Sequence, residues 1–221
     1  MSYAICVILH AKIVYLNILF LIYINDIVEN LSCNAYIFAD DMKLFSGITS
    51  DLDISKLQTD INTISTWTDK WLLKLNAHKC KIMTVGKSYN DQTRTYQLDS
   101  QNLCAVTEEK DLGVLIDNDL QFENHILSKI KTANRITGLV RRNFKNIDFP
   151  GFLLLYKSMI RSHLEYAQTV WSPHKVKLVE ALEKVQNVLL KFFLDLDICH
   201  TVSDFRNFIY PLWCTGEQEV T

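Results

Sequence analysis

The spacing of hydrophobic positions changes about halfway along this 221-residue chain. Up to about residue 119, short apolar runs of strand length surround one long stretch with helical spacing. Beyond that point apolar residues recur every three or four positions, which is the period of helices that bury one face. The pattern therefore predicts an α+β portion followed by an all-helical portion.

A β-hairpin is predicted between residues 34 and 47. Residues 35–39 and 42–45 form two short apolar runs, and Asp40 and Asp41 lie between them, where a two-residue turn is expected. Two adjacent carboxylates repel each other, and a bound divalent cation offsets that repulsion. The alternative is a plain solvent-exposed turn, because Asp is favoured in turns without any ligand.

The remaining elements follow from periodicity and capping residues. A long helix is predicted over residues 50–75, with Ser50 and Asp53 as its N-terminal cap. Strands are predicted at 79–85 and 112–116, and shorter ones at 96–98 and 103–106. After residue 119 three helices are expected, the second capped by Asp148 with Pro150 in its first turn.

Residues 1–24 are predicted to form an apolar N-terminal helix. The stretch 4–24 is interrupted only by His10, Lys12 and Asn17, and it is long enough to cross a bilayer. Lys12 near its middle would cost roughly 2.5–3.5 kcal/mol on an insertion scale. A helix packed against a protein core is therefore favoured, with membrane insertion through residues 4–24 as the alternative.

Charge and cysteine content narrow the class of protein. The formal net charge of −2 is mild evidence against a dedicated nucleic-acid binder. The six cysteines show no metal-binding spacing, which favours reduced thiols in an intracellular protein of the nucleus or cytoplasm. Charge is uneven, however, because six cations and no acidic residue lie between residues 129 and 145. They are Lys129, Lys131, Arg135, Arg141, Arg142 and Lys145.

Several boxes in order resemble a known family. Phe38-Ala39-Asp40-Asp41 resembles the aromatic-Ala-Asp-Asp box of reverse transcriptases, and residues 19–27 resemble the segment before it in non-LTR (LINE-type) retrotransposons. An Asp-Asp pair alone is a weak signal, but many boxes in the same order are specific. Further resembling segments are 67–71, 75–81, 110–114, 156–158, 164–167 and 170–173.

The resemblance implies a partial right-hand polymerase palm over residues 25–119 and a thumb-like helical region over 120–195, with 196–221 unassigned. It implies RNA-directed DNA synthesis by two-metal nucleotidyl transfer, with Asp40 and Asp41 as ligands of Mg²⁺. An RNA template and a DNA primer are the implied partners. Phe38 and Ala39 would pack near the primer end, and Lys79 and Lys81 would face the nucleotide or primer. The cations of residues 129–145 would follow the nucleic-acid backbone, or form a solvated helix face.

The chain also departs from the family. A two-metal site needs a third carboxylate from an earlier palm strand, yet the first acidic residue is Asp26. The nucleotide-positioning box and the fingers have no counterpart either. We therefore expect a catalytically incomplete fragment. The alternatives are a polymerase completed by a partner chain, and a non-catalytic relic that binds nucleic acid or inserts in a membrane.

Overall fold

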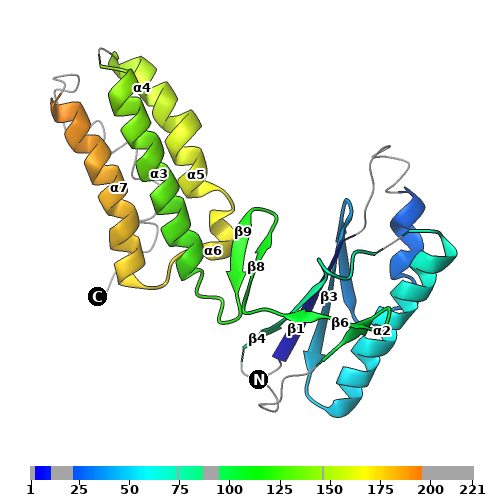
Figure 1. Ribbon diagram of the computed structural model, residues 1–221. Helices are drawn as coiled ribbons and strands as arrows, with labels where there is room; N and C mark the ends of the chain where they lie inside the picture. Colours follow the sequence, from blue (N-terminus) through cyan, green and yellow to red (C-terminus); the bar gives the residue numbers. More distant parts are fainter. Residues whose placement is uncertain (1–2, 11–21, 74, 87–94, 146, 196–221) are drawn as a thin grey trace, which may run out of the picture. The chain divides into compact units, whose positions relative to one another are not determined.

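The computed structural model describes residues 3–10, 22–73, 75–86, 95–145 and 147–195, which belong to two compact units (Figure 1). The first, called the sheet unit below, comprises Met1–Asp111 and Ile116–Leu120. The second, called the helical unit, comprises Leu112–Leu115 and Gln121–Thr221. The chain passes from one unit to the other within a β-hairpin, and this hairpin is built from β8 (Glu108–Asp111) and β9 (Val114–Asp117).

The sheet unit is built on a five-stranded sheet with the order β2-β3-β1-β4-β7. Its strands are β1 (Tyr3–His10), β2 (Asn34–Phe38), β3 (Asp41–Ile48), β4 (Lys81–Val85) and β7 (Cys104–Ala105). Strand β1 pairs antiparallel with β3 along its whole length and with β4 on its other side. Only the β4–β7 pairing is parallel among these described strands.

The helix predicted for residues 1–24 is wrong for Tyr3–His10, which form the central strand of the sheet. A continuous apolar run has no periodicity that separates a buried strand from a buried helix. The neighbouring strands decide the outcome, because β3 and β4 each present a row of backbone groups that a strand between them satisfies. Residues 11–21 lie outside the described part of the chain.

Membrane insertion was the alternative for the same segment. Among the residues that the structure describes, no helix combines the length and the hydrophobicity needed to span a bilayer.

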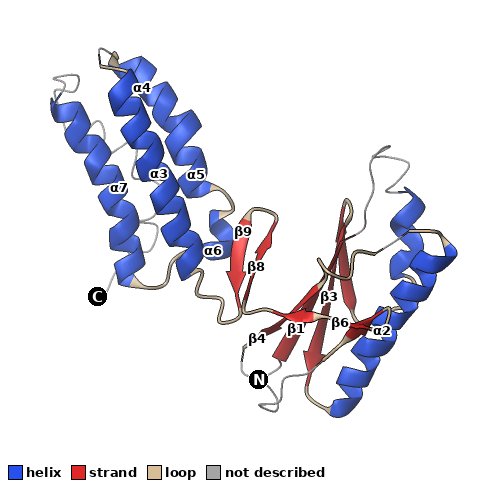
Figure 2. Ribbon diagram, viewed as in Figure 1, coloured by secondary structure: helices blue, strands red, loops and turns tan. Residues whose placement is uncertain are grey.

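Helix α2 (Asp51–Lys70) covers one face of the sheet (Figure 2). The predicted cap is confirmed: Ser50 and Asp53 form a reciprocal capping box at its start. Leu57, Ile61 and Ile64 of α2 are fully buried against the alternate residues of β3 that face the helix. The strands and the helix thus share one core, whose other buried members include Ile27, Met42, Leu44, Ile48, Ile82, Leu98 and Leu103.

Asp60 ties the start of the hairpin to α2. Its buried carboxylate accepts the backbone N–H groups of Ser32 (3.0 Å) and Cys33 (2.9 Å) and the Ser32 hydroxyl (2.8 Å). Burial opposes ionisation of Asp60, but these hydrogen bonds outweigh it and lower the pKa of the carboxyl below its ordinary value. Burial and the nearby Asp60 raise the pKa of the Cys33 thiol to about 12, so this cysteine stays protonated.

Smaller strands complete the sheet unit. β5 (Gln97–Leu98) and β6 (Gln101–Asn102) form a short hairpin that Gln58 of α2 holds through two hydrogen bonds to Gln97. The strand predicted at 112–116 begins later than expected. Leu112 and Gly113 instead form the β8–β9 turn, both with positive φ (43° and 85°), as a two-residue hairpin loop of type I′ requires.

The helical unit begins with α3 (Glu123–Asn143). The chain returns through α4 (Phe149–Leu155), the π-helical segment η2 (Tyr156–Arg161) and α5 (Ser162–Glu165), then runs through α6 (Gln168–Trp171) into α7 (Val176–Asp195). The predicted cap at Asp148 is confirmed, since its side chain accepts the Gly151 N–H. The helices bury apolar side chains along their facing sides, among them Ile126, Ala133, Val140, Phe152, Tyr156, Ile160, Leu164, Trp171, Leu178, Leu182 and Val185.

Two side chains hold the turn of the β8–β9 hairpin against the helices. The Tyr166 hydroxyl donates to the Leu112 carbonyl (2.7 Å), and a Cβ atom at Gly113 would lie only 3.1 Å from the Tyr166 ring. Buried His125 accepts the Leu115 N–H at Nδ1 (3.0 Å) and packs against the Trp171 ring. Burial, and secondarily the charge of Lys129, lower the pKa of His125 to about 4.

This histidine makes the stability of the helical unit depend on pH. An unfolded histidine has a pKa near 6.5, so between pH 6.5 and 4 the unfolded state binds the extra proton. Stability is therefore full above pH 6.5 and falls as pH drops toward 4, by about 2–3 kcal/mol. Urea unfolding monitored by Trp fluorescence at several pH values measures this loss. In a His125→Leu variant the same interval should show a flatter pH dependence, and an unchanged slope would contradict the assignment.

Candidate functional site

The Asp40–Asp41 pair lies at the turn of the β2–β3 hairpin, one residue out of its predicted register. Phe38 pairs with Asp41, so the two-residue loop is Ala39–Asp40 and Asp41 is the first residue of β3. Ala39 takes the positive φ (54°) that the loop needs, a conformation that costs a residue other than glycine energy. The turn leaves Asp40 exposed and Asp41 half-buried.

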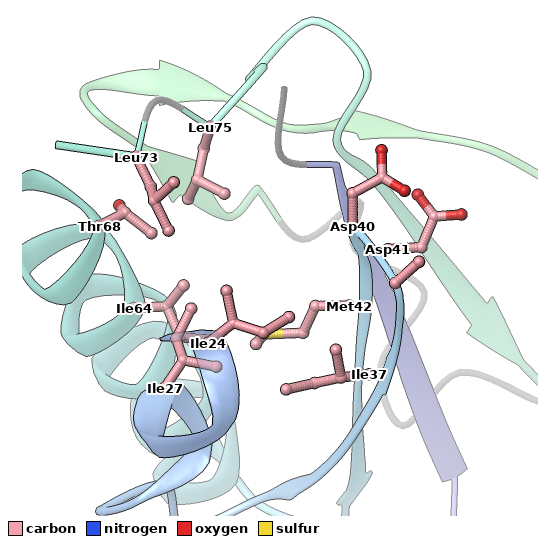
Figure 3. A pocket seen from close by; sticks show the side chains of 11 residues that line it. Ile24, Ile27, Ile37, Asp40, Asp41, Met42, Ile64, Thr68, Leu73 and Leu75 are labelled. Atoms are coloured by element: carbon pink, nitrogen blue, oxygen red, sulfur yellow. The ribbon is translucent and has the colours of Figure 1, made fainter. Parts of the chain in front are cut away.

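A small apolar pocket of about 30 Å³ lies behind this turn. Figure 3 shows both carboxylates at its edge, pointing away from the apolar side chains that line it. The pocket lies next to the core between the hairpin and α2. Apolar side chains therefore lie behind the two carboxylates, which point toward solvent. Its apolar lining comprises Ile24, Ile27, Ile37, Met42, Ile64, Leu73 and Leu75.

The strand register identifies the position that faces the carboxylates. His10 of β1 is the residue directly opposite Asp41 of β3. Directly opposed residues of an antiparallel pair project to the same face of the sheet. The β1 sequence, Tyr-Ala-Ile-Cys-Val-Ile-Leu-His, contains no acidic residue. A strand therefore runs beside the turn as expected for such a site, but it brings no third carboxylate.

The donor set limits which metal arrangement fits. Mg²⁺ is commonly held by one or two carboxylates with waters and substrate phosphates completing its shell, so Asp40 and Asp41 fit one hydrated ion. Among the described residues no group of three His, Cys, Asp or Glu side chains converges on one point. The residues present therefore do not fit a two-ion centre that needs a third carboxylate.

Aromatic side chains line the hairpin beside the turn. Phe38 is 60% exposed and Tyr36, two residues earlier on the same face, is 64% exposed. The Tyr36 and Phe45 rings pack edge-on, with 5.6 Å between their centroids. The structure thus brings Phe38 and Ala39 next to the two aspartates, and it adds Tyr36 and Phe45, which the sequence interpretation did not include.

The two lysines predicted beside the nucleotide have different surroundings. Lys79 is exposed in the loop before β4. Lys81 of β4 forms an ion pair with Glu109 of β8 (2.6 Å). Lys43 of β3 forms an ion pair with Asp111, which also belongs to β8. Strand β8 therefore neutralises two cations of the sheet, an arrangement that no local sequence pattern reveals.

The six predicted cations of residues 129–145 lie on and just after α3. Lys129 is half-buried with its ammonium group over the Tyr166 ring (5.5 Å), and the other five are exposed. Lys131, Arg135 and Arg142 follow one stripe of the helix, since their spacings of four and seven residues keep them on one side. That stripe lies opposite the buried face of Ile126, Ala133 and Val140.

Comparison with known proteins identifies the family. A profile described as "Reverse transcriptase (RNA-dependent DNA polymerase)" matches residues 17–151, more than half of the chain. The chain belongs to the reverse transcriptase family. It is 29% identical over 140 residues to the RNA-directed DNA polymerase from the mobile element jockey of Drosophila funebris. No solved structure shows a significant match.

These findings confirm the recognition of a LINE-type reverse transcriptase. The aligned region covers 61% of this chain and 15% of the jockey polymerase, so the chain spans a small part of that relative. The mixed sheet and helix architecture agrees with part of a polymerase fold. Reverse transcriptases as a family depend on metal ions and bind a template and a primer. The profile match begins at residue 17, after strand β1.

The ion pair between Lys81 and Glu109 can be tested by asking whether Glu109 keeps the Lys81 ammonium group from binding phosphate. In Glu109→Gln the ammonium group of Lys81 loses its carboxylate, so inorganic tripolyphosphate should bind about fivefold tighter, as one freed charge contact of about 1 kcal/mol implies. Isothermal titration calorimetry measures the change. Asp51→Asn removes one exposed carboxylate at the start of α2 and serves as the charge-matched control. Equal gains in tripolyphosphate affinity in the two variants would show a general charge effect and would contradict neutralisation of Lys81 by Glu109.

Proposed function

We propose that the sheet unit is part of the palm of an RNA-directed DNA polymerase, with Asp40 and Asp41 as its metal-binding carboxylates. Support comes from their position at an exposed hairpin turn backed by a packed core and from the family match across this segment. Mg²⁺ bound there would supply charge stabilisation for nucleotidyl transfer. Phe38 and Ala39 would pack near the primer end, and exposed Lys79 would face its backbone.

We further propose that this chain does not polymerise by itself. The observation that carries this is the pairing of His10 with Asp41. The position beside the aspartates is occupied by a strand, but that strand contributes no carboxylate. Two carboxylates fit one hydrated ion, whereas a two-ion centre uses one ion at the attacking oxygen and one at the leaving oxygen. A partner chain that supplies the remaining carboxylate is the route by which the site would become complete.

The helical unit is proposed as a thumb-like surface for the template and primer. Twelve Lys and Arg outnumber six Asp and Glu between residues 121 and 195, whereas residues 1–120 hold ten of the former and fifteen of the latter. The weak overall charge therefore hides a cationic stretch, residues 121–195. Phosphate contacts supply most of the affinity in non-specific nucleic-acid binding, so this surface suits a polyanion without sequence preference. Nucleic-acid binding without catalysis is accordingly the second candidate function.

One experiment tests the catalytic proposal by restoring a carboxylate. His10→Asp places it opposite Asp41 and should tighten Mn²⁺ binding on the order of tenfold, because affinity in such sites rises with ligand charge. Electron paramagnetic resonance of free Mn²⁺ gives the affinity, and extension of a DNA primer on an RNA template with Mg²⁺ or Mn²⁺ gives the activity. The unmodified chain should bind Mn²⁺ weakly and give no extension.

Two controls separate the outcomes. His10→Asn changes the same position without adding charge and should leave Mn²⁺ affinity unchanged. Asp40→Asn with Asp41→Asn should abolish Mn²⁺ binding, and persistent binding would show that the turn is not the metal site. Extension by the unmodified chain that is lost in this double variant would contradict the proposed inactivity, because a third ligand would then exist.

A further inference from the structure

Helix α7 carries a line of cations that lies outside the basic segment of α3. Lys177, Lys184 and Lys191 are spaced by seven residues, and all three are exposed. Seven residues make almost two full helical turns, so the three side chains follow one stripe with a rise of about 10.5 Å between neighbours. Among the α7 side chains that the structure describes, the buried ones are Leu178, Leu182, Val185 and Gln186, which lie on another side of the helix.

These lysines differ from several other cations of the chain in their surroundings. Lys43, Lys81, Arg161 and Lys175 each form an ion pair with a carboxylate. Within the part of the chain that the structure describes, Lys177, Lys184 and Lys191 form no ion pair. No carboxylate of the described chain therefore holds their ammonium groups, which stay available to an external anion.

The stripe belongs to the outside of the same bundle as the basic stripe of α3. Helices α3 and α7 lie side by side (Figure 1). Glu123, the first residue of α3, forms an ion pair (2.8 Å) with Lys175, which directly precedes α7. Glu180 and Glu183 also lie on α7 and reduce its local potential, so the stripe gains its effect from the net positive charge of residues 121–195 as a whole.

We propose that Lys177, Lys184 and Lys191 form a second contact with the sugar–phosphate backbone of the nucleic acid that α3 binds. This inference rests on the proposed nucleic-acid binding by the helical unit, and it extends that surface to residues that no motif marks. The ligand class follows from charge complementarity: unpaired ammonium groups at regular intervals suit a polyanion with regularly spaced phosphates. No base is read, so binding through α7 carries no sequence preference.

The test measures binding of the full chain to a fluorescein-labelled RNA–DNA hybrid by fluorescence anisotropy across a series of KCl concentrations. Each phosphate contact adds about 0.9 to the slope of log affinity against log salt on a duplex. Changing Lys177, Lys184 and Lys191 together to Gln should reduce that slope by about 2 to 3, and affinity at low salt should fall equally for hybrids of different sequence.

Matched variants isolate the contribution of α7. Lys56, Lys70 and Lys110 are exposed lysines of the sheet unit, and changing them to Gln makes the same change in net charge with no expected change in slope. Glu180→Gln with Glu183→Gln should strengthen binding, because it removes two carboxylates from α7. Thermal unfolding followed by circular dichroism confirms that each variant is folded.

The outcomes separate this inference from the function on which it rests. If the α7 variant keeps the original slope while a Lys131, Arg135 and Arg142 to Gln variant loses it, the α7 contact is overturned and the α3 surface stands. Equal losses in the α7 variant and the sheet-unit control also overturn it, as a general charge effect. If the unmodified chain does not bind the hybrid at low salt, the nucleic-acid function and the α7 contact both fall.

Discussion

Strand β1 is hydrogen-bonded on both sides, and the arrangement of the sheet unit depends on this double pairing. It joins the β2–β3 hairpin to β4, which are separated in sequence by the whole of α2. Without it, β3 and β4 would each expose a row of backbone donors and acceptors beside a buried core. The same pairing fixes what stands next to the two aspartates, because it places His10 opposite Asp41. The register of β1 against β3 therefore determines both the strand order of the sheet and the residue that lies beside Asp41.

The elements that sequence could predict are those whose signals are local. The capping box of Ser50 and Asp53 and the cap at Asp148 depend on residues a few positions apart, and both are present. Strand β1 could not be assigned, because its apolar residues show no alternation. Strand β8 was missed for the opposite reason: Glu108–Asp111 is wholly charged, and it is held by its ion pairs to Lys43 and Lys81.

In the candidate site, too, features with local sequence signals were predicted and those that depend on tertiary contacts were not. The Asp40–Asp41 turn was found from its flanking apolar runs, although the loop lies one residue earlier because Ala39 takes the positive φ. The partner of Lys81 is 28 residues away in sequence, so its neutralisation needed the tertiary structure. Charge segregation was visible in the sequence for residues 129–145 as a run, whereas the lysines of α7 lie seven residues apart and form a stripe only on the helix.

Amide hydrogen exchange tests most directly whether Tyr3–His10 form the middle strand of the sheet. Amides of residues 4–8, which lie between two hydrogen-bonded strands, should exchange as slowly as those of Leu44 and Ile82 in the neighbouring strands, at a rate limited by unfolding of the unit. Exchange of residues 4–8 as fast as that of an unstructured segment, with β3 and β4 still protected, would contradict the account. The position opposite Asp41 would then be open to another chain.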